Sequence, residues 1–190
     1  MNNKNHCLWK PHVNLSLKTS NFNLKSLNLN DANDQHVAWL NDKEVNTWLN
    51  SNWKNHDIST IKKFILTQDH YNTFHLGVFE GLNQSHIGNI TILIDHYHKT
   101  AETRVLIGEK NWWGKGVVIE CRSIILDWLF NSIKVYKVYG QPSMKNIAAV
   151  FNYQKQGYEC EAILKNHKIS LNNDRYDVGV FSLTRNSWKN

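Results

Sequence analysis

The sequence is short of the residues that would cross-link the chain or hold a metal through sulfur. It has three cysteines among 190 residues, at Cys7, Cys121 and Cys160. Because they are odd in number, far apart and without a Cys-x-x-Cys pair, they indicate neither a disulfide framework nor a thiolate metal site. Reduced thiols in a reducing compartment are the expectation.

Long apolar runs are also missing. No stretch approaches the roughly 20 consecutive apolar residues that a membrane-spanning helix needs. The polar opening Met1–Cys7 lacks the apolar centre of a secretory signal. We therefore expect a cytoplasmic protein without a membrane partner.

The chain has no block of like charge either. Its 22 lysines and arginines against 16 acidic residues give a formal charge of +6, but they are scattered along the sequence. Scattered positive charge favours anionic partners through long-range attraction, without indicating nucleic acid. A polyanionic small molecule, such as a nucleotide sugar or coenzyme A, satisfies the same electrostatics.

Apolar residues are plentiful enough for one core. They make up 41% of the chain, and no repeat or linker stands out. We expect a loose N-terminal segment over residues 1–20 and a single domain over residues 21–187.

Apolar spacing predicts the secondary structure of this domain. Alternation indicates strands over residues 22–27, 74–79, 87–94, 133–140, 158–164 and 176–183, and another strand that ends at 105–108. Helical spacing indicates helices over residues 37–49 after a cap at Asn30-Asp31, from Ser59-Thr60 onward, and over residues 117–129 and 146–156.

The order of these elements predicts an α+β fold. We expect a mixed, mostly antiparallel central sheet of about seven strands flanked by about four helices. Parallel pairing is expected around the long helix, because a helical crossover joins strands in parallel.

A glycine-containing loop before the long helix is the first chemical feature. Gly114 and Gly116 allow the backbone to approach a ligand where free N–H groups and the positive end of the helix dipole face outward. This geometry binds phosphate, and Lys115 adds a charge. A Gly-x-Gly before a helix is equally often a tight turn, so the loop is not specific alone.

A second feature pairs Asn146 with Tyr153. The two residues are two helical turns apart, so both side chains can face one cleft beside the sheet. Asn146 could instead serve only as a helix cap, and Tyr153 could be a half-buried core residue with its hydroxyl satisfied locally.

Taken together, these segments resemble the GCN5-related N-acetyltransferase (GNAT) superfamily, and more closely its ribosomal-protein-acetyltransferase-like branch. The matches are Trp113-Gly-Lys-Gly116 with Glu120-Cys121, then Asn146, Ala149, Tyr153 and Gly157-Tyr158, with Ile87-Gly-Asn-Ile90 and Tyr176-Asp177 also fitting. Their joint spacing is far more specific than any single motif.

The resemblance implies an acetyl-CoA-dependent N-acetyltransferase that needs no metal. It implies a bulge in the strand ending at Ile107 and a V-shaped slot beside the strand of residues 135–140, where the pantetheine arm lies. Tyr153 donates a proton to the departing thiolate. The implied cofactor-binding residues are Leu106 and Ile107 at the thioester, Asn146 at the pantetheine, and Trp113, Gly114, Lys115, Gly116, Val117 and Val118 at the pyrophosphate.

Two positions need separate comment. Val118 is bulkier than the Gly or Ala usual in the superfamily, which could reduce cofactor affinity. Glu102, on the strand that leads to the slot, is the candidate general base, directly or through water. An exposed glutamate on a strand is usually only solvated.

The acceptor is indicated only indirectly. The run Trp39–Asn46 with Trp48-Leu49 resembles acetyltransferases of nucleotide-linked amino sugars. We expect a primary amine on a small anionic acceptor, since positive charge disfavours a polycation such as spermidine. A protein N-terminus, a polyamine or an aminoglycoside stays open, as do a non-catalytic acyl-CoA-binding module and a homodimer.

Pocket shape would decide among the acceptors. A cleft closed by the first two helices favours a small molecule, and a wide cleft favours a protein. Trp39, Trp48 and Trp53 lie in this region and either stack on the acceptor or pack in the core.

Two further sites are discounted. Asp95-His-Tyr-His98 lies in a polar turn without a distant partner cluster, so no metal is predicted. Cys121 lies on the apolar face of a helix and is expected to be a small buried hydrophobe.

Overall fold

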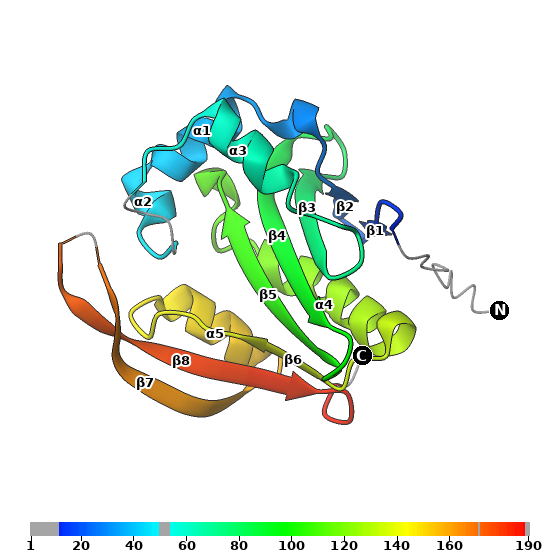
Figure 1. Ribbon diagram of the computed structural model, residues 1–190, viewed down its shortest axis with the longest axis vertical. Helices are drawn as coiled ribbons and strands as arrows, with labels where there is room; N and C mark the ends of the chain where they lie inside the picture. The colour runs from blue at the N-terminus through cyan, green and yellow to red at the C-terminus, as the bar shows by residue number, and fades with distance from the viewer. Residues whose placement is uncertain (1–11, 50–53, 171, 189–190) are drawn as a thin grey trace.

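The computed structural model describes residues 12–49, 54–170 and 172–188, which form one sheet with helices packed on it (Figure 1). The strand order is β1-β2-β3-β4-β5-β6-β8-β7. The strands are β1 Ser16–Lys18, β2 Phe22–Ser26, β3 Thr73–Glu80, β4 His86–Asp95, β5 Thr100–Ile107, β6 Lys137–Gly140, β7 Glu159–Ile169 and β8 Arg175–Thr184. The α-helices are α1 Asp34–Asn41, α2 Lys43–Asn46, α3 Ile58–Ile65, α4 Val117–Trp128 and α5 Ile147–Lys155.

The predicted α+β class and mixed sheet are confirmed, with one more strand and one more helix than expected. The extra strand, β1, pairs with β2 and lies inside the segment that we expected to be loose. Leu15 and Leu17 are buried there, so apolar burial orders the chain before residue 21. Residues 16–18 are therefore ordered, and the domain bounds stay a prediction.

The extra helix arises at Asp42, which splits the helix predicted over residues 37–49. Asp42 has extended backbone angles and so ends α1. Its carboxylate accepts from the amides of Glu44 and Val45 and so caps α2. Asn33, rather than Asn30-Asp31, caps α1 through a bond to the His36 amide at 3.0 Å.

Parallel pairing occurs at β5–β6, as expected from the crossover through α4. It is only three pairs long, from Thr100↔Lys137 to Glu102↔Tyr139. Beyond Glu102, β5 continues to Ile107 paired with β4, while β6, which pairs with β8 along its whole length, ends at Gly140. The two strands therefore separate, and the predicted slot opens between them.

The bulge predicted in β5 is wrong. The β4–β5 ladder keeps one register from Asp95↔Thr100 to Gly88↔Ile107. The register shift lies instead between β3 and β4, at Val78/Phe79. Separation of β5 from β6 thus needs no bulge, because β6 itself ends at Gly140.

The two faces of the sheet are covered differently. Helices α4 and α5 pack on the face that carries Ala101, Val138 and Phe181, where the main core lies. The other face is covered by α1 and α3 at one end, through a smaller cluster of Leu27, Ala32, Ile61 and Ile65. Within the described ranges, no helix is long and apolar enough to cross a membrane.

Candidate functional site

The loop before α4 has the geometry that phosphate binding requires. Gly114 and Gly116 have φ angles of 73° and 77°, in the left-handed region that glycine adopts without strain. A Cβ at either position would meet nothing within 4 Å, so backbone conformation rather than space demands glycine. Gly116 caps α4 without a side-chain hydrogen bond, which leaves the first amides of the helix facing outward.

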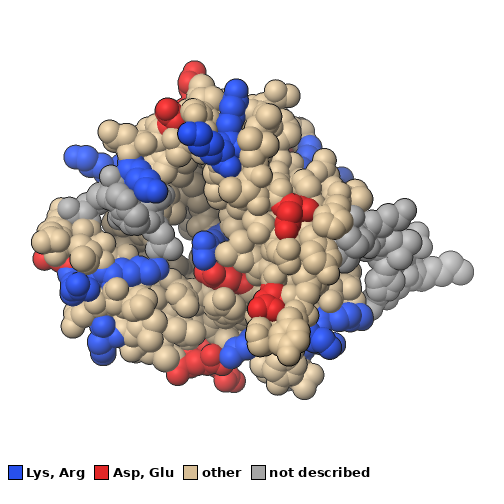
Figure 2. Space-filling view, in the orientation of Figure 1, with Lys and Arg blue, Asp and Glu red and all other residues tan. Residues whose placement is uncertain are grey.

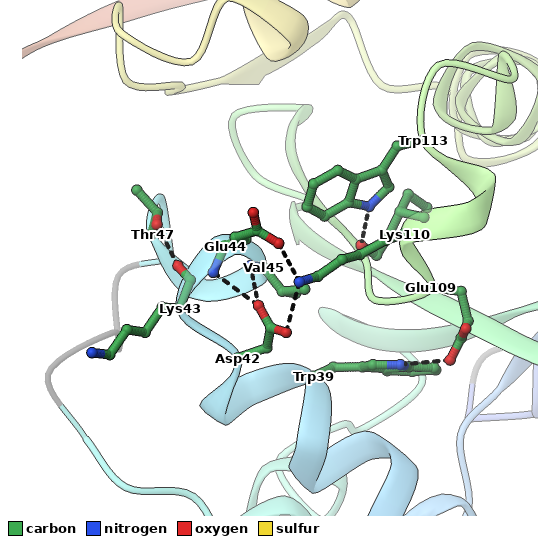
Figure 3. Close-up of polar contacts among 10 residues, drawn as sticks. Trp39, Asp42, Lys43, Glu44, Val45, Thr47, Glu109, Lys110 and Trp113 are labelled. Atoms are coloured by element: carbon green, nitrogen blue, oxygen red, sulfur yellow. Dashed lines mark hydrogen bonds and ion pairs between the residues drawn. The ribbon is translucent and has the colours of Figure 1, made fainter.

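Neighbouring loop residues fix this cradle to the sheet. The Trp113 indole donates to the Ile107 carbonyl at 2.9 Å (Figure 3). The side chain of Val117 is buried in the core, so only its backbone can meet a ligand, and Val118 is half-buried. The Lys115 ammonium lies 5.3 Å from the Trp112 ring centroid, at the exposed side of the loop.

Backbone groups along β5 alternate between β4 and the slot. The Gly108 amide donates to the Ile87 carbonyl at 3.0 Å, so even-numbered residues bond toward β4 and odd-numbered residues face the slot. Of the two residues predicted at the thioester, Ile107 therefore faces the slot and Leu106 turns toward β4. Val105 takes the second position on the slot edge.

The Tyr153 hydroxyl lies where the slot begins. It donates to the Thr103 carbonyl at 3.4 Å, one residue beyond the last β5–β6 pair. A Cβ at Gly140 would overlap this hydroxyl, so a side chain there is excluded. The Tyr153 ring is buried as the core alternative required, but its hydroxyl is delivered to the opening between the strands.

The Tyr153 ring is held by aromatic and cationic contacts. It stacks on Phe181 with centroids 5.4 Å apart, and the Arg122 guanidinium carbon lies 4.2 Å from the Tyr153 centroid. Arg122 is 2% exposed and donates to Gln156 at 3.2 Å. Among the described residues, no carboxylate forms an ion pair with Arg122, and its Nε has no hydrogen-bond partner. Sequence reasoning missed Arg122, although a charge inside the apolar stripe of α4 was a visible signal.

Asn146 and Glu120 both make structural contacts. The Asn146 side-chain oxygen accepts from the Ala149 amide at 3.1 Å, so Asn146 caps α5. Glu120 accepts from the backbone and side chain of Asn21, each at 2.9 Å, which ties α4 to the β1–β2 turn. The cap fixes where the cleft-facing end of α5 lies.

Glu102 occupies the opposite face of β5 from the Tyr153 ring. Its two oxygens accept from Nε and Nη2 of Arg104, each at 2.8 Å. Because Glu102 precedes Thr103 directly, the two predicted catalytic residues meet the same point of β5 from opposite faces. A shallow pocket of about 200 Å³ lies beside Glu102 and Tyr139.

Helices α1 and α2 form a roof over this face, fixed at several points (Figure 3). The Trp39 indole donates to Glu109 at 2.9 Å, and Lys110 forms ion pairs with Asp42, at 2.8 Å, and Glu44. Trp48 contacts Tyr176 of β8 edge to face, with centroids 6.0 Å apart. Trp53 lies outside the described residues.

Buried histidines join α1 to the sheet beneath this roof. The Asn89 amide donates to His36 Nε2 at 2.8 Å, and His86 Nε2 donates to the Asn89 oxygen at 2.8 Å. Burial lowers the pKa of His36 to about 4 and also lowers the pKa of His86. Both rings are therefore neutral at pH 7. The His36 ring has to be neutral, because its Nε2 accepts a hydrogen bond from the Asn89 amide.

The discounted sites have ordinary surroundings. In the described parts of the chain, no group of three or more His, Cys, Asp or Glu side chains could hold a metal. Asp95 accepts from the His98 amide at 2.8 Å within its turn. Cys121 is fully buried, and burial raises the pKa of its thiol.

Comparison with known proteins gives a family. The model of the acetyltransferase (GNAT) domain matches residues 21–159. Spermidine N(1)-acetyltransferase of Escherichia coli (strain K12) is 29% identical over 79 residues, which are 42% of this chain and only 41% of that enzyme.

Solved structures share the fold at low identity. Spermidine N-acetyltransferase from Vibrio cholerae, in complex with CoA and spermine, has a TM-score of 0.77 at 19% identity, over 89% of this chain and 98% of that one. Ribosomal-protein-S5-alanine acetyltransferase from Vibrio fischeri has a TM-score of 0.76 at 15% identity, over 93% and 100%. From the match to the family model over most of its length, the chain belongs to the GNAT acetyltransferase domain family.

Proposed function

We propose that the protein is an acetyl-CoA-dependent N-acetyltransferase for the primary amine of a small anionic acceptor, with a nucleotide-linked amino sugar as the best candidate. The observation that carries this proposal is the Tyr153 hydroxyl at the point where β5 and β6 separate. A proton donor there faces the slot whose other end is the glycine cradle of α4.

The residues present fit acetyl-CoA. Outward-facing amides at the start of α4, with Lys115, suit the pyrophosphate. The slot edge of β5 offers the Ile107 amide and the backbone of Val105 to the extended pantetheine arm, as in strand addition, with Asn146 at its side. The Ile107 carbonyl already accepts from the Trp113 indole. When bound, acetyl-CoA supplies an activated acetyl group.

Glu102 and Tyr153 then accept and donate the protons that the reaction moves. An ammonium acceptor first gives one proton to the Glu102 carboxylate, directly or through water, so that the neutral amine can attack the thioester carbon. As the N–C bond forms and the C–S bond breaks, the nitrogen loses a second proton to solvent, and the Tyr153 hydroxyl protonates the departing thiolate. One acetyl group moves from sulfur to nitrogen.

The roof supports a small acceptor. Contact between Trp48 and Tyr176 joins the segment that follows α2 to β8 across the face that carries Glu102. A folded protein would need this face open, whereas an amino sugar is small enough to enter between the roof and the sheet.

Charge pairing supports an anionic acceptor over a polyamine. The carboxylates near this face are already bound to cations, Glu102 to Arg104 and both Asp42 and Glu44 to Lys110. A polycation would have to displace these cations. The spermidine and spermine in the relatives' names are therefore not carried over to this chain.

The test is release of free coenzyme A thiol from acetyl-CoA with nucleotide-linked amino sugars, polyamines, aminoglycosides and N-terminal peptides. We expect release with the amino sugars, and Tyr153→Phe should slow it by roughly ten- to a thousandfold. Tyr97→Phe is the matched control, since Tyr97 is 88% exposed in a distant turn. Binding of acetyl-CoA without release in any class would contradict the proposal and favour an acyl-CoA-binding module.

A further inference from the structure

One row of paired residues crosses four strands where the slot closes. Each member of the row is the pairing partner of the next, from β3 through β4 and β5 to β6. Paired residues of neighbouring strands point to the same face of a sheet, so the four side chains lie side by side on the face that carries Glu102. The row consists of Thr73, Leu93, Glu102 and Tyr139.

These four residues line the pocket of about 200 Å³ that lies beside Glu102. Asp95 and Thr100, which pair in the next row of the same face, line it as well, together with Asn72 and Ile94. The side chains on this face thus include two carboxylates and three hydroxyls around a single apolar group, Leu93. Such a lining suits a ligand that carries several hydroxyl groups and an amine.

The pocket has room for one sugar ring but not for a whole nucleotide sugar. Its volume of about 200 Å³ is below the roughly 300 Å³ at which sites for drug-sized ligands begin. Figure 2 shows the molecule hollowed between the α1–α2 roof and the β7–β8 hairpin, with basic groups around the hollow. The nucleotide of an acceptor whose ring fills the pocket therefore has a positively charged space to occupy outside it.

Tyr139 lines the pocket at the point nearest to the proposed reaction centre. Glu102↔Tyr139 is the last β5–β6 pair, and the next residue of each strand, Thr103 or Gly140, adjoins the Tyr153 hydroxyl from the opposite face. Tyr139 is half-buried, and burial above all raises the pKa of its hydroxyl. The hydroxyl is therefore protonated and neutral at pH 7, so it can both donate and accept a hydrogen bond.

Glu102 keeps room for an ammonium group beside Tyr139. Each of its oxygens accepts one hydrogen bond from Arg104, and a carboxylate oxygen can accept two. Glu102 and Tyr139 are neighbours on adjacent strands, which lie roughly 5 Å apart. An ammonium group between the two side chains can thus donate one N–H to the carboxylate and another to the phenol oxygen.

We propose that this pocket holds the amine-bearing sugar ring of the acceptor, with Tyr139 and Glu102 on the amine and Asp95 and Thr73 on the ring hydroxyls. This inference rests on the proposed function and adds the residues that select the acceptor. Tyr139 selects an amine over a hydroxyl at the reacting carbon. Asp95 selects a hydroxylated ring over an alkyl amine.

Binding to CoA-loaded protein tests the pocket without requiring turnover. Protein saturated with CoA is titrated by isothermal calorimetry with UDP-glucosamine, with UDP-linked sugars that carry the amine at C3 or C4, and with UDP-linked sugars that carry a hydroxyl in its place. We expect an amino sugar to bind more tightly than its hydroxyl counterpart. Tyr139→Phe should weaken binding of the amino sugar by about tenfold and that of the hydroxyl sugar by less than about threefold.

Asp95→Asn separates ring recognition from amine recognition. Asparagine keeps an oxygen that can accept from the His98 amide, so the turn after β4 should be preserved. Because Asp95 is assigned to the ring hydroxyls, this variant should weaken binding of the amino sugar and the hydroxyl sugar alike, by about fivefold. The preference for the amine then stays at its wild-type value.

Two control variants make the same chemical changes outside the pocket. Tyr136 directly precedes β6 and is 53% exposed, and Asp174 is exposed next to the start of β8. Neither residue lines the pocket. Tyr136→Phe and Asp174→Asn should therefore leave binding of every sugar within about twofold of wild type.

The possible failures are distinct. Failure of every amino sugar to bind, or tighter binding of spermidine than of any amino sugar, overturns the assignment of the pocket. An equal loss for amino and hydroxyl sugars in Tyr139→Phe overturns the role of Tyr139, because damage to packing alone would affect both ligands. Binding of an amino sugar without thiol release from acetyl-CoA would count against the proposed function and not against the pocket.

Discussion

The proposed cofactor side and the proposed acceptor side of this protein are built in different ways. The cofactor side, made of the glycine loop, α4 and α5, depends on features a few residues apart: two left-handed glycines, a bare helix start and the Asn146 cap. The acceptor side joins segments from the whole chain, as in Trp48 with Tyr176 and Lys110 with Asp42. The features of the proposed cofactor side are thus local in sequence, whereas those of the proposed acceptor side depend on tertiary contacts.

The largest expected difference between the two sides is a loss of folding stability at low pH, caused by His36 of α1 beneath the roof. Because its folded pKa lies near 4, below the ordinary 6.5, the unfolded chain takes up the proton first. Its contribution to stability is complete above pH 6.5 and is lost as pH falls toward 4, by about 3 kcal/mol. Urea unfolding from pH 7 to 4.5 measures this loss.

A non-titrating variant supplies the control for that measurement. His36→Gln keeps an acceptor for the Asn89 amide and should make the pH dependence less steep, while His86 and His75, whose pKa values burial also lowers, keep the remainder. An equally steep profile in His36→Gln would mean that the acid sensitivity lies elsewhere. Coenzyme A binding should change less with pH than unfolding does, because the cofactor side does not include this histidine pair.

The second effect is a slower reaction when Arg122, a buried residue of α4 outside the predicted motifs, is replaced. Arg122→Met removes the charge over the Tyr153 ring while filling similar space, and should slow thiol release by about tenfold with the KM for acetyl-CoA unchanged. Stability should hold or rise, because a buried charge without an ion pair is costly. Steady-state kinetics and thermal melting check both.

Adding Arg122→Met to the Tyr153→Phe variant tests whether Arg122 acts through the Tyr153 hydroxyl or only through packing. If Arg122 acts through the Tyr153 hydroxyl, Arg122→Met should add little to Tyr153→Phe, and Arg122→Lys should recover part of the rate. Full additivity of the two changes would contradict that role.

The smallest expected effect is a local loosening of α2 that leaves α4 unchanged. Lys110→Met removes the ion pairs that fasten α2 to the loop after β5. Amide hydrogen exchange in α2 should rise about threefold while exchange in α4 stays the same, since exposed pairs stabilise only locally. Lys43→Met, on α2 itself, is the control, and a matching rise in α4 would mean that the two sides are coupled.

Residue spacing was enough to predict most of the helices and strands, including the two helices of the proposed cofactor side. The helix predicted over residues 117–129 is α4, and the helix predicted over residues 146–156 is α5 with Asn146 as its cap. These predictions succeed because helix periodicity, caps and glycine turns depend on neighbours a few residues apart. The same logic placed Tyr153 two turns after Asn146.

Spacing could not give contacts that depend on how strands and helices are brought together. The direction of Leu106 follows from the β4–β5 register, which the predicted bulge would have shifted. Only the tertiary structure brings Lys110 to Asp42 and Trp48 against Tyr176, because segments more than 60 residues apart in the sequence meet only once the sheet has formed. The sequence by itself therefore determined the fold and the glycine loop before α4, and only the tertiary structure decided which side chains gather on the face of the sheet that carries Glu102.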